Sequence, residues 1–231
     1  MPLNQGFTLW LTGMSGAGKT TLADYLAARL RQVGRQVEVL DENDIAEELW
    51  GGSTDVKEER STAGRRMGYV ASLLSRNQVA VLAAAVSPYK AVRDENRRVI
   101  GRYLEVYVDC PTEKLIARDT TGKYKKALGG EIPNFIGITE PYEPPVSPEV
   151  TIRSDLDTVE AGAQRIFQAL LDLGHLTPED LKIITGKRTR ATSAARKARA
   201  HGKGARVRPA ARAARMAKRT RPSKKSGKGK R

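Results

Sequence analysis

The sequence contains one cysteine, Cys110, among its 231 residues, so it cannot form an internal disulfide. The absence of disulfides is typical of a reducing compartment, and we expect a cytoplasmic location. No apolar run approaches the length of a membrane span, and the run at 7–11 is too short for a signal peptide. The composition therefore predicts neither a disulfide framework, nor secretion, nor a membrane partner.

Acidic residues are missing from residues 186–231, which hold 19 of the 41 lysines and arginines. The other 22 basic residues stand against 26 acidic ones, so residues 1–185 carry a net charge of −4 although the whole chain carries +15. The segment 186–231 also lacks aromatic residues and apolar periodicity, so it cannot bury enough apolar surface to offset its chain entropy. We predict one folded domain at 1–185 and a disordered basic tail at 186–231.

Three roles are open for the basic tail: a solubilising extension, a tether to nucleic acid or another polyanion, and a docking arm for a partner. Its uncompensated charges would bind phosphate backbones non-specifically and with a steep salt dependence. Because it has no aromatic residue for base stacking, we do not expect sequence-selective binding of nucleic acid.

The most specific local motif is a phosphate-binding loop. Residues 13–20 read GMSGAGKT and fill every fixed position of G-x-x-x-x-G-K-[ST]. The loop follows an apolar run at 7–12 and precedes a segment at 20–30 whose leucines recur every four residues, which predicts a strand and then a helix. The N–H groups of such a loop and helix N-terminus bind phosphate. The residues expected at ATP are Gly13, Ser15, Gly16, Ala17, Gly18, Lys19, Thr20 and Thr21.

Within this loop, Lys19 would bridge the β- and γ-phosphates of ATP, and the Thr20 hydroxyl would hold Mg²⁺. Asp41 ends the second predicted strand and would point into the same site. It could simply cap the following helix, or it could act in the chemistry and share the Mg²⁺ with Thr20. Both interpretations of Asp41 stay open at this stage.

Strands and helices alternate along the rest of the domain. We expect strands at 7–12, 36–40, 79–86, 104–108 and 150–152, with helices at 20–30, 45–50, 57–76, 90–98, 112–118, 158–173 and from 178. This order predicts an α/β fold of the P-loop NTPase type, with three layers and a parallel sheet of about five strands. The side chains expected in the core include Trp10, Met67, Val70, Leu73, Leu74, Ile166, Leu170 and Leu173.

Residues 119–148 interrupt the alternation with a segment rich in proline and glycine. A long irregular segment inside a compact domain is usually functional or disordered. Its three lysines at 123, 125 and 126 would stand beside the triphosphate, which predicts a lid.

Together these motifs resemble the adenylylsulfate kinase (APS kinase) family over about 165 residues, from 7 to 171. The loop at 13–20 is similar to the family's G-x-S-G-A-G-K-[ST], and residues 86–90, VSPYK, resemble its I-S-P-Y-R. The lid matches almost in full, at Arg118-Asp119 and at 122–127, 130–132, 135–138 and 141–145.

The resemblance implies transfer of the γ-phosphoryl group of ATP to the 3′-hydroxyl of adenosine 5′-phosphosulfate, with Mg²⁺, in a family that is often dimeric. Phe135 matches an aromatic residue that stacks on the acceptor's adenine, and Arg60 matches an arginine that contacts the acceptor. The implied site comprises Lys19, Asp41 and Ser87 in catalysis, Arg118, Lys125 and Lys126 over the phosphates, and Asp41, Asp44, Arg60, Val86, Ser87, Phe135 and Ile136 at the acceptor.

Two of these assignments have simpler alternatives. Ser87 could hydrogen-bond phosphate at a strand end, and we favour this over a covalent intermediate because phosphoryl transfer needs mainly positioning and charge stabilisation. Arg60 lies among charged residues and could belong to a solvated helix face.

The chain departs from the family pattern on the acceptor side. Ala46 stands in place of a second acceptor-binding arginine, Asp55 in place of a stacking phenylalanine, and Ala63 in place of an asparagine, while 42–44 read END instead of GDN. A different nucleotide acceptor, such as a cytidine diphosphate derivative, therefore stays open. A further alternative is a nucleic-acid-associated nucleotide-binding protein whose basic tail carries the function.

Overall fold

The computed structural model describes residues 5–52, 54 and 56–186, and within them the strands form one parallel sheet. The order across the sheet is β2-β3-β1-β4-β5. The strands are β1 (Phe7–Thr12), β2 (Val37–Asp41), β3 (Ala80–Ala85), β4 (Tyr103–Asp109) and β5 (Val150–Arg153). Because every neighbouring pair is parallel, the carboxyl ends of all the strands lie at one edge. The predicted α/β P-loop kinase fold is confirmed.

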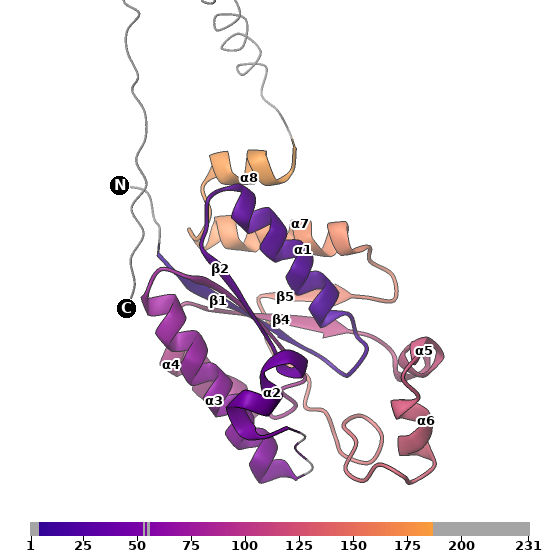
Figure 1. Cartoon of the computed structure of the whole chain (residues 1–231). Coiled ribbons are helices and arrows are strands. Elements are labelled where there is room, and N and C mark those ends of the chain that lie inside the picture. Colours follow the sequence, from indigo (N-terminus) through magenta and orange to yellow (C-terminus); the bar gives the residue numbers. More distant parts are fainter. Residues whose placement is uncertain (1–4, 53, 55, 187–231) are drawn as a thin grey trace, which may run out of the picture. The chain divides into compact units, whose positions relative to one another are not determined.

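Helices cover both faces of this sheet. Figure 1 shows α1, α7 and α8 on one face and α3 and α4 on the other, with α5 and α6 beyond the carboxyl edge. The helices are α1 (Lys19–Gln32), α2 (Glu42–Trp50), α3 (Lys57–Arg76), α4 (Lys90–Ile100), α5 (Thr112–Arg118), α6 (Lys123–Leu128), α7 (Val159–Asp172) and α8 (Pro178–Ile184). None of the helices in the described part of the chain is long and apolar enough to cross a membrane.

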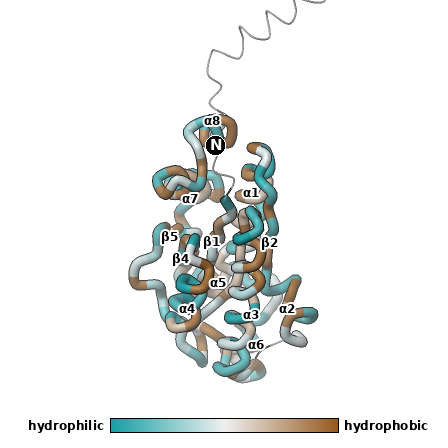
Figure 2. The backbone as a smooth tube through the Cα atoms, turned by 90° about the vertical axis from the view of Figure 1, so that its left-hand side faces the viewer, coloured by the Kyte–Doolittle hydropathy of each residue, from teal (hydrophilic) through white to brown (hydrophobic). Residues whose placement is uncertain are grey.

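The core lies between the sheet and the two helical layers. Every residue of β1 and β3 is buried, as expected for central strands that are covered on both faces. One apolar cluster joins β1 to α1 and α7, and includes Leu26 and Phe167. A second cluster packs Trp10 against Met67 of α3. Figure 2 follows this pattern, with hydrophobic stretches in the strands at the middle of the domain.

Some details of the predicted core are wrong. Leu173 was expected to face inward, but its exposed fraction is 52% because α7 ends at Asp172. On α3, Met67 is buried as predicted, and Val70 and Leu74 are half-buried and pack against the second cluster, while Leu73 is also only half-buried. The most buried face of α3 instead carries the small residues Ala63, Gly68, Ala71, Ser72 and Ser75, alongside Met67. Small side chains let the helix approach its neighbours closely.

The predicted lid at 119–148 is less irregular than expected, because it contains the short helix α6. Tyr124 and Ala127 of this helix are buried, and the Tyr124 hydroxyl donates to the Ser15 carbonyl at 2.7 Å. The lid is therefore tied to the phosphate-binding loop. At the other end of the domain, Thr177 and Asp180 form the capping box that opens α8. Of the predicted tail, residues 187–231 lie outside the described residues.

We predict that Gly68→Ala destabilises the domain even though alanine is the better helix former. Helix propensity alone would stabilise the variant by up to about 1 kcal/mol. However, a Cβ at Gly68 would lie 2.1 Å from Oδ1 of Asn96, a buried side chain of α4 that also donates to the Gly64 carbonyl. Overpacking of this kind typically costs about 1–3 kcal/mol, so the free energy of unfolding in urea should fall.

The matched control for this prediction is the same substitution in an Asn96→Ala background, where the obstructing amide is absent. There Gly68→Ala should be neutral or stabilising. A gain in stability from Gly68→Ala in the otherwise unchanged chain would contradict the packing argument.

Candidate active site

The phosphate-binding loop connects β1 to α1 at the carboxyl edge of the sheet. A Cβ at Gly13 would lie 2.3 Å from the Val108 carbonyl oxygen of β4, so only glycine fits this close approach. Gly18 takes a φ of +96° as the N-cap of α1. These two positions let the loop turn tightly over the strand ends and direct the helix N-terminus at the space above them.

Lys19, the first residue of α1, folds back over this loop. Its ammonium donates to the carbonyls of Gly13 at 2.9 Å and Met14 at 3.0 Å, and the residue is only 8% exposed. Burial lowers the pKa of Lys19, while the nearby carboxylates of Glu42 and Asp41 raise it. The loop thus holds an amino group at the place where phosphates of a bound nucleotide would lie.

Asp41 ends β2 and is buried beside the loop. Its Oδ1 accepts from the backbone N–H of Asn43 at 2.9 Å, so Asp41 caps α2. Its Oδ2 accepts from the Thr20 hydroxyl at 2.5 Å. The carboxylate therefore caps a helix and also faces the phosphate-binding loop, so the two interpretations of Asp41 are not exclusive.

The pair Thr20 and Asp41 fits a magnesium ion that arrives with a nucleotide. In the described part of the chain, no group of three or more His, Cys, Asp or Glu side chains could form a complete metal site. Mg²⁺ does not need one, because it usually takes one or two protein oxygens and completes its shell with water and phosphate oxygens. A hydroxyl and a carboxylate that already touch offer two such oxygens.

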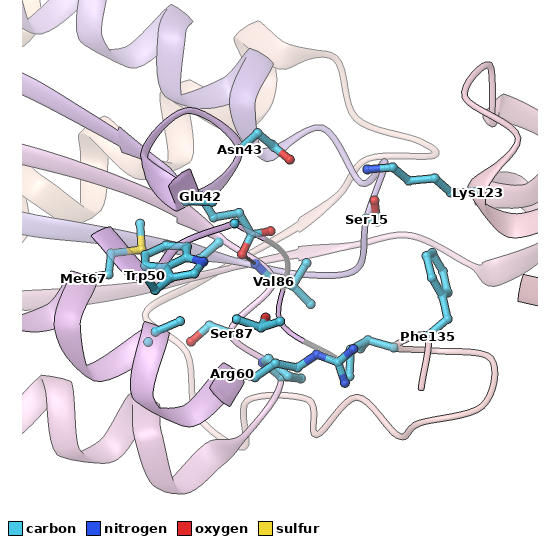
Figure 3. Close-up of a pocket in the computed structure, with 18 of the residues that line it drawn as sticks. Ser15, Glu42, Asn43, Trp50, Arg60, Met67, Val86, Ser87, Lys123 and Phe135 are labelled. Carbon is cyan, nitrogen blue, oxygen red and sulfur yellow. Dashed lines mark hydrogen bonds between the residues drawn. The ribbon is translucent and has the colours of Figure 1, made fainter. Parts of the chain in front are cut away.

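A cavity of about 340 Å³ opens next to the loop. Its walls come from the phosphate-binding loop, α2, α3, the turn after β3 and the lid, and Figure 3 shows these side chains converging on one space. The predicted site residues that line it are Ser15, Arg60, Val86, Ser87, Phe135 and Ile136. Segments far apart in the sequence therefore meet at the carboxyl edge of the sheet.

Two donors in this cavity have no protein partner. The Ser87 hydroxyl and Nη1 of Arg60 are both buried and unpaired, although Nη2 of Arg60 donates to the Asn134 carbonyl at 2.6 Å. A buried polar group without a partner costs about 1–3 kcal/mol. Such groups are expected where a ligand completes the hydrogen bonding, so Arg60 is more than a solvated helix residue.

Hydrogen bonds from Thr12 and Arg93 hold the turn that carries Ser87. Ser87 has a φ of +45°, a conformation that is strained for serine. The Thr12 hydroxyl donates to the Val86 carbonyl at 2.7 Å, and Nη1 of Arg93 donates to the Ser87 carbonyl at 2.7 Å. Arg93 is itself buried and paired with Glu105 at 2.8 Å. This network fixes the strained turn at the mouth of the site.

Two further charged residues line the cavity: Glu42, which the sequence marks only as a departure from the family pattern, and Lys123, which was expected in the lid but not among the assigned site residues. Glu42 accepts from the Val86 backbone N–H at 2.9 Å and lines the cavity, where burial raises its pKa and the Lys19 ammonium opposes that rise. Lys123 reaches the cavity from the lid, and Figure 3 shows it near Ser15 and Asn43. Lys123 is exposed, as Lys125 and Lys126 are, but of these three lysines it is the one that lines the cavity.

Other predicted residues lie outside the cavity walls. Lys125 and Lys126 are exposed on α6, and Arg118 donates to the Ser154 carbonyl at 3.1 Å. Asp44 is exposed on α2. Lys19, Thr20 and Asp41 lie beside the cavity without lining it. The roles of all these residues stay predictions. Of the departures from the family pattern, Ala46 and Ala63 line the cavity, and Asp55 lies outside the described residues.

Comparison with known proteins gives one consistent family. The adenylylsulphate kinase family model matches residues 5–153. An adenylyl-sulfate kinase of Rippkaea orientalis is 49% identical over 172 residues, which cover 74% of this chain and 95% of the relative. A counterpart from Myxococcus xanthus is 47% identical over 180 residues, covering 76% of this chain and 97% of the relative.

Solved structures agree. An APS kinase of Mycobacterium tuberculosis in complex with AMPPNP and APS is 32% identical, with a TM-score of 0.69, and the match covers 74% of this chain and 99% of that one. A hexameric APS kinase from Thiobacillus denitrificans is 30% identical, with a TM-score of 0.57, and the match covers 75% of this chain and 30% of that one.

The position of Lys123 leads to a testable prediction. Lys123→Ala should lower kcat/KM for ATP by about ten-fold or more, because a lysine that faces the phosphates makes a charge-assisted hydrogen bond. Lys125→Ala, on the same helix but outside the cavity, should change it by less than about two-fold on the same reasoning. Steady-state kinetics on both variants measure the difference. A larger loss in Lys125→Ala would contradict this prediction and place the functional lysine where the family resemblance implies it.

Proposed function

The chain belongs to the adenylylsulphate kinase family, and we propose that the cavity beside the phosphate-binding loop is where it carries out the family's reaction. The protein is an ATP-dependent phosphotransferase that phosphorylates the 3′-hydroxyl of adenosine 5′-phosphosulfate (APS) and releases ADP. The observation that supports this location is that Ser15 of the loop and the Ser87 turn line a single cavity, while Asp41, next to the lining residue Glu42, is hydrogen-bonded to Thr20 at the end of the same loop.

We assign the donor half of the reaction to the loop and its neighbours. The loop N–H groups and the α1 N-terminus bind the phosphates of ATP, and Lys19 exchanges its carbonyl partners for phosphate oxygens. Thr20 and Asp41 would hold the Mg²⁺, which neutralises charge on the phosphates when bound. Lys123 would add a cation from the lid side.

The acceptor half is assigned to the opposite walls of the cavity. Nη1 of Arg60 and the Ser87 hydroxyl are free to bind anionic oxygens of the acceptor, and Phe135 offers a ring to its adenine. The acceptor oxygen forms a bond to the γ-phosphorus as the bond to the β–γ bridging oxygen breaks. Asp41 orients the acceptor hydroxyl or accepts its proton, with Glu42 beside it.

The experiment that tests this function follows the transfer of label from γ-³²P-ATP to a panel of acceptors that includes APS and cytidine diphosphate derivatives. We expect label in the 3′-phosphorylated product of APS. Lys19→Ala should abolish transfer, because the loop then lacks the cation that pairs with the transferred group. The folding control is the circular dichroism spectrum of the variant.

Two results would contradict parts of the proposal. Phosphoryl transfer at the wild-type rate by the Lys19→Ala variant would show that the reaction does not depend on this loop. Transfer to another nucleotide but not to APS would keep the kinase and replace its acceptor, an outcome that Ala46 and Ala63 in the cavity wall leave room for.

We further propose that residues 186–231 attach the enzyme to polyanions. The support is their charge alone, 19 basic residues without an acidic one. The full chain should elute from heparin or DNA columns at much higher salt than a chain ending at residue 186, because each released counterion adds to the salt dependence. Equal retention of the two proteins at low salt would refute the idea. A homodimer and a cytoplasmic location also stay predictions.

A further inference from the structure

The cavity has one end that the donor chemistry does not use. It is lined by two residues of α2, Ala46 and Trp50, and three of α3, Ala63, Gly64 and Met67. None of these five is charged. Figure 3 shows Trp50 and Met67 on the opposite side of the cavity from Lys123 and Phe135. The cavity therefore combines a polar side at the phosphate-binding loop with an apolar end that contains an indole.

The way α2 ends holds the backbone next to Trp50. Gly51 takes a φ of +82°, and the N–H groups of Gly51 and Gly52 donate to carbonyls of α2 at 3.1 and 3.0 Å. Arg66 of α3 donates to the Leu49 carbonyl at 3.1 Å, which satisfies another free carbonyl of the last turn. The indole is thus presented by a closed helix end and not by a free loop.

The space beside the indole is kept open by small residues. Ala46 lies one helical turn before Trp50 on the same face of α2, and Ala63 and Gly64 lie across from them on α3. The helix α2 has no fully buried residue, and Trp50 itself is half-buried. Trp50 packs against the second core cluster and also lines the cavity, so part of the side chain is not covered by the core.

Independent features of the same cavity indicate a ligand. The Ser87 hydroxyl is buried, 9% exposed for the residue as a whole, and has no partner, and Nη1 of Arg60 is also unpaired. A molecule that satisfies these donors while it fills the cavity has polar groups near Arg60 and Ser87 and an apolar surface near Trp50. A nucleotide combines both, because its base is planar and presents a π-face to any aromatic ring.

We propose that Trp50 contacts the acceptor substrate, with the planar base of the nucleotide packed against its indole ring. This inference rests on the proposed function, in which the acceptor is a nucleotide. Phe135 approaches from the lid side, so Trp50 supplies the second aromatic surface that the sequence, with Asp55, predicted to be missing. By the usual contribution of base–aromatic stacking, the contact is worth about ten-fold in affinity.

Tryptophan fluorescence tests the contact directly, because the chain has only Trp10 and Trp50. Trp10 is fully buried in β1, and its indole N–H has no partner, so Trp10→Phe removes the background signal without breaking a hydrogen bond. In this full-length variant, APS and adenosine 5′-phosphate should quench the fluorescence of Trp50 saturably. Inorganic sulfate and pyrophosphate, which have no base, should not. In the complementary variant Trp50→Phe, the signal of Trp10 should stay unchanged.

Kinetics separate a substrate contact from a purely structural role. Trp50→Phe keeps an aromatic ring and should leave the KM for the acceptor within about three-fold, whereas Trp50→Leu keeps only apolar volume and should raise it about ten-fold. The KM for ATP should stay within about two-fold in both variants, since the donor binds at the loop.

The outcomes are distinct. The inference is refuted if the base-containing ligands leave the fluorescence unchanged, or if Trp50→Leu matches Trp50→Phe, or if Trp50→Leu raises both KM values equally. If no acceptor receives phosphate, the proposed function fails, and the fluorescence titration with adenosine 5′-phosphate still decides whether a base binds at Trp50. If either variant does not fold, the other arm of the test remains decisive.

Discussion

The parallel pairing of β2, β3 and β1 is the constraint on which the rest of the site depends. It places three strand ends side by side, because Asp41 lies opposite Ala84 and Thr12 lies opposite Ala85 in register. The phosphate-binding loop, the carboxylate of Asp41 and the Ser87 turn follow directly from these ends. A shift of register by one residue would turn Asp41 away from Thr20 and separate the donor site from the acceptor site.

Around this edge, the protein uses buried polar contacts to hold groups that would otherwise be unfavourable. Arg93, paired with Glu105, donates to the carbonyl of the strained residue Ser87. The Thr20 hydroxyl donates to Asp41, and the Lys19 ammonium donates to loop carbonyls. Contacts within the protein therefore order the site, which lowers the cost of ordering it during the reaction.

Much of this arrangement could be predicted from the sequence. The loop at 13–20 has a fixed spacing with a defined physical role, and apolar strands that alternate with helices predict a parallel sheet, so the location of the site followed. Arg60, Ser87 and Phe135 were placed through the family resemblance, and all three line the cavity. The family and the fold agree with the comparisons.

What the sequence did not predict depends on how helices are rotated in the packed domain. The local sequence pattern did not indicate which of the three lysines of α6 lines the cavity, because the buried side of this helix is set by contacts across the lid. Lys123 lines the cavity, and Lys125 and Lys126 do not. Glu42 departs from the family pattern in sequence, and only the fold shows that the Val86 N–H donates to it. The proposed role of Trp50 could not be predicted from the sequence, because it depends on the small residues of α3 that line the same cavity.

The central claim is that donor and acceptor bind in one cavity, with the acceptor hydroxyl facing the γ-phosphate beside Asp41. The measurement that tests it most directly is a crystal structure of the full chain with a non-hydrolysable ATP analogue and APS bound together. The account predicts the analogue's phosphates on the loop at 13–20 and the acceptor between Arg60, Ser87 and Phe135, with its 3′-hydroxyl toward the γ-phosphate. An acceptor bound outside this cavity, or with its 3′-hydroxyl turned away from the γ-phosphate, would contradict the account.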